Sequence, residues 1–259
     1  MKIPKLNPNY RAALVLLLMA GILIATSILS DRNDFTSAAL VIAGLACMLT
    51  GVFFAALSGS DPLDLRYLSL LPVQGSINLV RTSADLGIQG NAHIIPGGRD
   101  GRNHPMQFMP VADYTGTPLL TEPFVAGPQT AGLLVEPSCA PLLRLLRERQ
   151  HLAIPSDMAA LHNLVKELGV EVLEVAERVS STHEGDVITV LMENYRLIDG
   201  CRAMIKESPK CCIANPCPVS GLYAAVFAEG TGKVIRIERC APDENQPNVT
   251  AVFSLPAEQ

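Results

Sequence analysis

Two uncharged apolar runs near the start of the chain constrain its fold more than any other feature. The first covers residues 12–30, where only three hydroxyl side chains are polar, and the second covers residues 35–60 without a single charge. A helix rises about 1.5 Å per residue, so each run can cross the roughly 30 Å hydrocarbon layer of a bilayer. We therefore predict a transmembrane helical hairpin with spans at residues 12–30 and 35–58.

A cleaved signal peptide is the alternative for the first run. Lys2, Lys5 and Arg11 resemble the basic start of such a peptide, and residues 25–27 loosely resemble a cleavage site. The apolar part of a signal peptide spans about 7 to 15 residues, however, and is shorter than this run. A second apolar run also follows after only residues 31–34. The hairpin is the favoured interpretation.

The basic residues near the two spans predict their orientation. Lys2, Lys5 and Arg11 precede the first span, and Arg66 follows the second. Only Arg32 lies between the spans. Because basic residues favour the cytoplasmic side, we expect both termini and the rest of the chain in the cytoplasm, at the cell membrane. Neither span contains Asp, Glu, Lys, Arg or His, which argues against a transporter or a proton path.

Small residues in the spans suggest how the two helices pack. Ala43, Cys47 and Gly51 recur at four-residue spacing in the second span. Gly21 and Ala25 of the first span could lie opposite them, since small residues let membrane helices approach closely. We expect these five residues to form the contact within the hairpin.

The chain is expected to comprise three parts, namely a basic flank (1–11), the hairpin (12–60) and a soluble domain (61–259) that could divide into subdomains at 61–150 and 151–259. About 200 residues are enough to bury a sizeable core. The net charge of −5, the scattered basic residues and the absence of Trp exclude a nucleic-acid partner. The expected partners are the lipid bilayer and either other membrane subunits or further copies of the chain.

Hydrophobic periodicity predicts that the soluble part is an α+β domain with a mostly antiparallel sheet. Helices are expected at residues 76–86, 137–149 and 157–168. Short strands are expected at residues 92–95, 106–109 and 131–135. Two hairpins are expected at residues 170–181 with 187–192 and at residues 233–239 with 249–255, and the second of these should end the sheet.

Several of these elements carry finer expectations. Ser156 is predicted as the N-cap of the 157–168 helix, with Gly169 just beyond its end. The 187–192 strand is expected to be buried on both faces, because apolar side chains occupy both alternating sets. A helix over residues 171–179 is the alternative to the first strand of that hairpin.

Two further segments leave alternatives open. Residues 62–72 are rich in apolar side chains and could lie along a membrane surface, although a helix packed on the domain is favoured. Residues 96–105 contain three glycines and two arginines that could cradle an anion. They lack the strand, helix and Lys-Ser/Thr of a phosphate loop, so a plain hairpin connection is favoured there.

Cysteines are concentrated late in the chain, where five of the seven fall: Cys201, Cys211, Cys212, Cys217 and Cys240. In a reducing compartment such clustering raises metal binding or thiol chemistry. Zinc or an iron–sulfur cluster are the candidate cofactors for this set. Four residues separate Cys212 from Cys217 and no second matching pair exists, so the spacing permits a metal without indicating one. The favoured interpretation is that most of these cysteines are small buried apolar residues.

Cys217 differs from the other cysteines because Pro218 follows it at a natural first helical position. The apolar spacing then predicts a helix that closes at residues 230–232. The sulfur of Cys217 would lie near the helix N-terminus, where unpaired amides and the helix dipole favour a thiolate. Cys217 is therefore the candidate reactive thiol, with Cys211 or Cys212 as a resolving partner.

The predicted order of elements over residues 186–255 is strand, helix, Cys-rich turn, helix, strand, strand. It resembles the small-molecule-binding domain shared by vinyl-reductase-type proteins and vesicle-tethering trafficking subunits. The resemblance rests on Gly200-Cys201, Ser220-Gly221, Ala228-Glu229 and Arg239-Cys240. It implies a ligand site, although residues 249–255 lack the closing Gly and Cys pattern of that family.

The whole chain also looks like the two-span membrane proteins of methane-producing archaea. This archaeal likeness rests on residues 85–87, 90–93 and 215–218. It implies no activity.

Two classes of function follow from these observations. The favoured one is a membrane-anchored cytoplasmic ligand-binding or scaffolding module, not an enzyme. It predicts an apolar cavity between the sheet and the helix over residues 218–229. The alternative is a thiol- or metal-dependent redox sensor or enzyme, and it predicts that the five clustered cysteines converge. The histidines lie in unrelated contexts with no nucleophile motif nearby, so no hydrolase triad is proposed.

Overall fold

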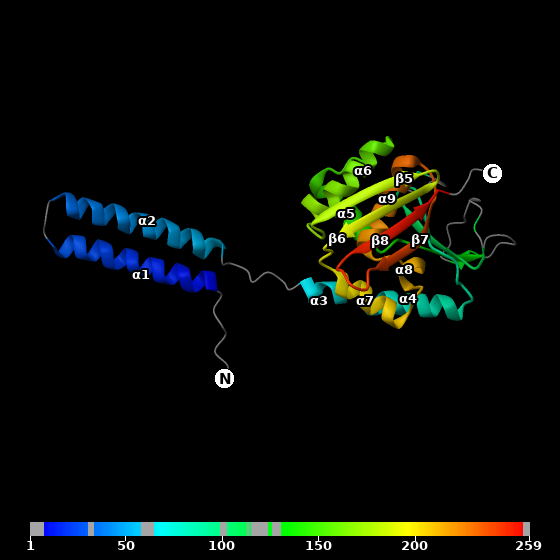
Figure 1. Ribbon diagram of the computed structural model, residues 1–259, viewed down its shortest axis with the longest axis horizontal. Coiled ribbons are helices and arrows are strands. Elements are labelled where there is room, and N and C mark those ends of the chain that lie inside the picture. The colour runs from blue at the N-terminus through cyan, green and yellow to red at the C-terminus, as the bar shows by residue number, and fades with distance from the viewer. Residues whose placement is uncertain are drawn as a thin grey trace. The chain divides into compact units, whose positions relative to one another are not determined.

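The computed structural model describes residues 8–30, 34–57, 65–98, 103–112, 114, 124–125 and 131–255. The chain divides into two compact units, residues 1–63 and 64–259. Figure 1 shows the helical hairpin of the first unit and the sheet with its surrounding helices in the second.

The first unit contains α1 (Pro8–Leu29) and α2 (Phe35–Leu57), helices of 22 and 23 residues. Both are long and apolar enough to cross a membrane, as the sequence predicted. Most of their large apolar side chains face outward, with Leu18, Ile22 and Phe53 among them. A helix that is apolar on its exposed face suits lipid better than water.

The two helices contact each other along a stripe that includes Gly51, as predicted, and has Cys47 half-buried, but Gly44 takes the place of the other three predicted residues. A Cβ on Gly44 would lie 2.8 Å from Cγ1 of Ile24, and one on Gly51 would lie 3.0 Å from Cγ of Leu17. Ala43, Gly21 and Ala25 are exposed instead. Gly44 and Gly51 are seven residues apart, about two helical turns, which keeps both on one face, whereas steps of four drift around the helix. Near the connecting turn, the hydroxyls of Ser27 and Ser37 lie 2.7 Å apart.

The second unit is built on a sheet of eight described strands in the order β3-β4-β2-β1-β7-β8-β6-β5. The strands are β1 (His93–Ile95), β2 (Met106–Pro110), β3 (Phe124–Val125), β4 (Gly132–Val135), β5 (Arg178–Glu184), β6 (Val187–Glu193), β7 (Ile235–Pro242) and β8 (Val249–Ser254). Their pairings are antiparallel, which agrees with the α+β prediction.

The hairpin of β7 and β8 lies in the middle of this sheet, so the prediction that it ends the sheet is wrong. β1 pairs with the free edge of β7, and β6 pairs with the free edge of β8. Sequence order shows only which strands are consecutive, whereas β1 comes from more than a hundred residues earlier. This pairing also joins the two predicted subdomains through one continuous sheet.

Seven α-helices and one π-helical turn are described in this unit. They are α3 (Leu65–Leu70), α4 (Val73–Asp85), α5 (Ala140–Gln150), α6 (Met158–Glu167), η2 (Leu168–Val172), α7 (Ile198–Glu207), α8 (Cys211–Ala214) and α9 (Pro218–Thr231). α9 contacts β1 and β7 as well as α5 and α6, and residues 219–228 are all buried. Residues 211–231 would suit a membrane span by length and composition, yet 83% of their most apolar window lies inside the domain.

Local details around η2 correct three expectations. The N-cap of α6 is Asp157, whose Oδ2 accepts a hydrogen bond from the Ala160 amide at 2.9 Å, in place of Ser156. Gly169 does not end the helix, because the chain continues into the π-helical turn and the glycine packs against Tyr223 and Val179. The following strand therefore begins only at residue 178, and the alternative helix over 171–179 is also absent from this described segment.

Burial along β6 is one-sided, in contrast to the prediction. Ile188, Val190 and Met192 are fully buried, while Val187 is exposed and the other alternate positions are half-buried. The apolar residues on the second face therefore do not indicate a second layer over this strand. Residues 99–102 of the glycine-rich loop lie outside the described residues, so its anion-binding alternative is not tested.

Candidate functional site

An apolar cavity of about 460 Å³ lies at the N-terminal end of α9. Its walls come from α3 and the turn that follows it, from the start of α7 and from the start of α9. The lining residues are Leu68, Ser69, Leu71, Pro72, Tyr195, Leu197, Gly200, Cys201, Met204, Cys217, Pro218 and Val219. Leu68 and Leu71 also reach the surface, so the cavity opens beside α3.

The cavity is not where the sequence placed it. The space between the sheet and α9 is filled core, in which Leu222, Val226 and Phe227 are completely buried. Ala224, Ala225 and Ala228 have small side chains, which lets neighbouring elements close on the helix. The cavity lies instead where α9 begins.

α3 is held over the cavity by one close backbone contact. Ser69 is a buried residue of α3, and a Cβ on Gly200 of α7 would overlap its carbonyl oxygen. The absence of a side chain at Gly200 therefore lets the two helices approach. The 62–72 segment thus contains a helix packed on the domain, as favoured from the sequence, although Tyr67 and Leu71 of that region remain exposed.

Gly200→Ala is expected to push α3 away from α7 and lower the free energy of unfolding by about 1–3 kcal/mol, as overpacking does. Gly75→Ala is the matched control, because it also lies inside a helix and a Cβ there meets nothing within 4 Å. That control should stabilise the domain by roughly 0.5–1 kcal/mol through helix propensity. Thermal unfolding of both variants checks this, and equal stability of the two would contradict the assigned contact.

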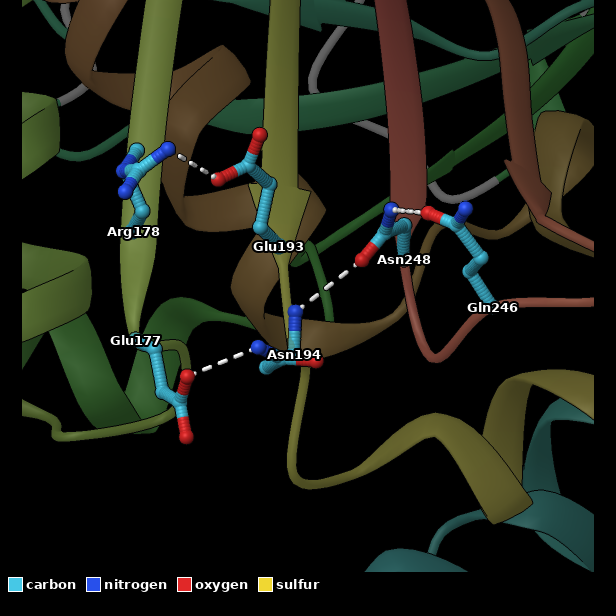
Figure 2. Close-up of polar contacts among 6 residues, drawn as sticks. All are labelled: Glu177, Arg178, Glu193, Asn194, Gln246 and Asn248. Atoms are coloured by element: carbon cyan, nitrogen blue, oxygen red, sulfur yellow. Dashed lines mark hydrogen bonds and ion pairs between the residues drawn. The ribbon is translucent and has the colours of Figure 1, made fainter.

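Tyr195 lines the cavity and is positioned by a polar network on the chain just before it. Asn194 has a φ of 50°, a left-handed conformation that asparagine tolerates. Its backbone N–H donates to Oδ1 of Asn248 at 3.0 Å, and its side-chain Nδ2 donates to Oε2 of Glu177 at 2.7 Å (Figure 2). The amide of Tyr195 then donates to the carbonyl of Pro247 at 2.6 Å. These bonds fix the direction in which the chain enters the cavity wall.

The same network is braced at both ends. Asn248 donates to Oε1 of Gln246 at 2.8 Å, and the cross-strand pair Arg178 and Glu193 forms an ion pair at 3.1 Å (Figure 2). The side chain of Tyr195 is nearly fully buried. Burial raises the pKa of its phenol well above the usual value, and the neighbouring Cys217 raises it further. Tyr195 therefore stays protonated and available as a hydrogen-bond donor beside that sulfur.

Cys217 is the N-cap residue of α9, with Pro218 in its first turn, as predicted. Its Sγ lies 3.4 Å from Oγ of Ser220, which in turn lies 3.3 Å from Sγ of Cys240. Cys201 lines the same cavity from α7. The sulfur of Cys217 is thus surrounded by groups that carry a donatable hydrogen.

These surroundings shift the pKa values of the neighbouring thiols in opposite directions. Hydrogen bonds from Cys201 and then from Cys240 and Ser220 hold the pKa of Cys217 well below its usual value, although burial opposes this. The pKa of Cys201 is raised by the same hydrogen bond and by burial. The pKa of Cys240 is raised by hydrogen bonds to Cys212 and Cys217. The arrangement concentrates thiolate character on Cys217, which is the property of a reactive cysteine.

The structure brings four of the five clustered cysteines together and leaves one aside. Cys201, Cys212, Cys217 and Cys240 form a connected set through the contacts above. Cys211 is buried nearby on α8, and burial followed by the charge of Cys212 raises its pKa to about 11. All seven cysteines lie in described segments and are free thiols.

A metal site is not formed by this set. Among the described residues, no three His, Cys, Asp or Glu side chains gather so that they could hold a metal ion. The thiols share hydrogens with one another and with Ser220, a chain-like arrangement that differs from four ligands around one point. Zinc and an iron–sulfur cluster therefore remain predictions from the sequence without a supporting geometry.

Cys139 also lies near this set, although the sequence analysis did not include it. Its Sγ would be 3.7 Å from a Cβ on Gly221, and burial raises its pKa to about 12. Tyr195, Met204 and the α3 residues were likewise missed as site residues. The sequence contains no motif that links them, because they meet only through the packing of α3 against α7.

In comparisons with known proteins, no family model, no curated sequence and no solved structure matches this chain.

Proposed function

We propose that this chain is a membrane-anchored module that binds an apolar small molecule in the cavity at the start of α9. The observation that carries the proposal is a cavity of about 460 Å³ with predominantly apolar walls that opens at the surface beside α3. Ligand pockets of roughly 300–1,000 Å³ with apolar walls and few polar groups are the usual form of small-molecule sites.

The few polar groups in the cavity support a selective site. The lining side chains with a hydrogen to donate are Ser69, Tyr195, Cys201 and Cys217. All four are buried, whereas Leu68 and Leu71 of the lining are exposed and form its rim. An occupant would therefore have an apolar body and one small polar or reactive group at its inner end.

The anchor in this proposal is the hairpin of α1 and α2. Lys2, Lys5 and Arg11 before the first span and Arg66 after the second favour both termini and the binding domain in the cytoplasm. Apolar ligands concentrate in bilayers because burial out of water stabilises them by about 0.8 kcal/mol per CH₂ group. A tether to the bilayer keeps the cavity close to that supply.

Photolabelling of the full chain in lipid nanodiscs with a diazirine-bearing dodecanol tests the binding proposal. Peptides that contain Met204 and Val219 should be labelled, and unlabelled dodecanol should compete. Leu71→Asp places a charge at the exposed rim and should reduce this labelling about tenfold, which corresponds to roughly 1.4 kcal/mol. Leu86→Asp is the control, because Leu86 is also an exposed leucine but lies outside the cavity lining.

Labelling of α1 and α2 by probe dissolved in the lipid serves as the internal reference. A constant ratio of cavity to hairpin labelling in Leu71→Asp and Leu86→Asp would contradict the proposal. Labelling confined to the hairpin would do the same.

A further inference from the structure

Two thiols face one apolar cavity, and this pairing has a chemical use beyond binding. Cys201 on α7 and Cys217 at the start of α9 both line the cavity, while Cys212 and Cys240 do not. The two sulfurs are close enough for each to shift the pKa of the other. The pair is thus adjacent to a space that an apolar reagent can enter.

We propose that Cys217 and Cys201 form a peroxide-sensing thiol pair that reduces one equivalent of an apolar organic hydroperoxide and closes to a disulfide. The proposal rests on the proposed function, because the same cavity would admit the hydroperoxide. It also names the class of molecule, one with an apolar body and a reactive O–O group.

The two steps balance as follows in atoms and electrons. The Cys217 sulfur attacks the terminal oxygen of ROOH, the O–O bond breaks, and the alkoxide takes a proton to leave as ROH. Cys217 is then a sulfenic acid. The Cys201 sulfur attacks the Cys217 sulfur, an S–S bond forms and the hydroxyl leaves as water with the Cys201 proton. In total two thiols lose two electrons, and the hydroperoxide is reduced to an alcohol and water.

Three features of the site assign the roles. Cys217 is the attacking sulfur because it is the N-cap of α9 and its Sγ lies 3.4 Å from the Ser220 hydroxyl, surroundings that favour the thiolate. Cys201 resolves because it lines the same cavity and is close enough to Cys217 to shift its pKa. Tyr195, which also lines the cavity, is placed to donate to the leaving oxygen.

The apolar lining selects the oxidant. Hydrogen peroxide carries a donor and an acceptor at each end and gains little from walls such as Leu68, Met204 and Val219. Cumene hydroperoxide buries its aromatic body there. It should oxidise the chain about tenfold faster than hydrogen peroxide, a ratio that corresponds to roughly 1.4 kcal/mol of binding.

The test uses the reduced full chain in nanodiscs with one equivalent of cumene hydroperoxide under anaerobic conditions. We expect the loss of two thiols, one equivalent of cumyl alcohol, and a disulfide between the peptides of Cys201 and Cys217 by mass spectrometry. The rate should stay level as the pH falls from 9 to 7, because the pKa of Cys217 lies well below its usual value. An ordinary thiol would slow over this range.

Variants separate the two roles. Cys217→Ala should abolish alcohol formation. Cys201→Ala should keep the first step and leave a sulfenic acid that dimedone traps. Cys211→Ala is the control and should react as the unaltered chain does, since Cys211 lies outside the cavity lining. Photolabelling by the dodecanol probe shows that each variant still folds around the cavity.

Several outcomes would overturn this inference. One is full alcohol formation in Cys217→Ala, and another is a disulfide that joins Cys212 to Cys240. A chain whose cavity is labelled by dodecanol but whose thiols survive cumene hydroperoxide would refute the thiol chemistry and leave the binding function in place. Absence of both labelling and oxidation would refute the two together.

Discussion

A chain that lacks residues 1–60 is expected to leave the membrane fraction and remain in solution, whereas the full chain should stay in the pellet after alkaline carbonate extraction. The deletion removes α1 and α2, the two exposed helices that are long and apolar enough to span a bilayer. On insertion scales each Leu, Ile, Phe or Val at a helix centre contributes about −0.3 to −0.6 kcal/mol, so two spans of some twenty residues hold the chain firmly. The third apolar stretch, residues 211–231, cannot replace them because it is the core of the domain.

The control for this deletion is the far-UV circular dichroism of the shortened chain. The second unit has its own core, in which Phe108, Phe227 and Phe253 are fully buried, so a mixed helix and sheet spectrum should be retained. Extraction of the full chain by carbonate would contradict the membrane anchor. Retention of the shortened chain in the pellet with a folded spectrum would place the attachment elsewhere.

Phe227→Ala is expected to destabilise the domain by about 3–5 kcal/mol, the range for removal of a fully buried Phe. The ring of Phe227 lies edge-on to His162 with centroids 5.6 Å apart, and its centroid is 6.3 Å from that of Phe253. The substitution therefore removes the ring contacts of α9 with His162 of α6 and with Phe253 of β8. A domain with a total stability of about 5–15 kcal/mol would lose a large share of it.

Thermal unfolding of the chain from residue 61 onward measures this effect. The midpoint should fall by roughly 6–20 °C, given about 2–4 °C per kcal/mol for a domain of this size. Leu145→Ala is the control, because Leu145 also lies on a helix but is exposed, and it should change stability by less than about 0.5 kcal/mol. A Phe227→Ala midpoint as high as that of Leu145→Ala would show that α9 is not the central packing element.

Local elements were predictable wherever residues close in sequence decide the structure. The two long apolar helices follow from uninterrupted apolar runs, and α9 begins at Pro218 and ends at Thr231, with Gly232 as its C-cap at a φ of 67°. These features depend on neighbours within a few residues. The N-cap of α6 was misplaced by one residue because Ser156 and Asp157 both suit the position, and only the hydrogen bond to Ala160 distinguishes them.

The site was predictable in its chemistry but not in its location. The helix-start position of Cys217 could be read from Pro218, and it identified the sulfur that the structure surrounds with hydrogen-bonding groups. Its partner could not be read in the same way. The predicted resolving residues Cys211 and Cys212 are close to Cys217 in sequence. The structure instead places Cys201 together with Cys217 in the lining of the cavity.

The sequence by itself determined the apolar hairpin, the α+β class and the capped helix that begins after Cys217, because each depends on short-range spacing of apolar, proline and glycine residues. Tertiary structure alone decided that β7 and β8 form the centre of the sheet, that residues 211–231 are core and not a span, and that the cavity lies beside α3. The physical reason is that these outcomes depend on which distant surfaces meet. The contact of Gly200 with Ser69 joins residues more than a hundred positions apart, and no local pattern encodes it.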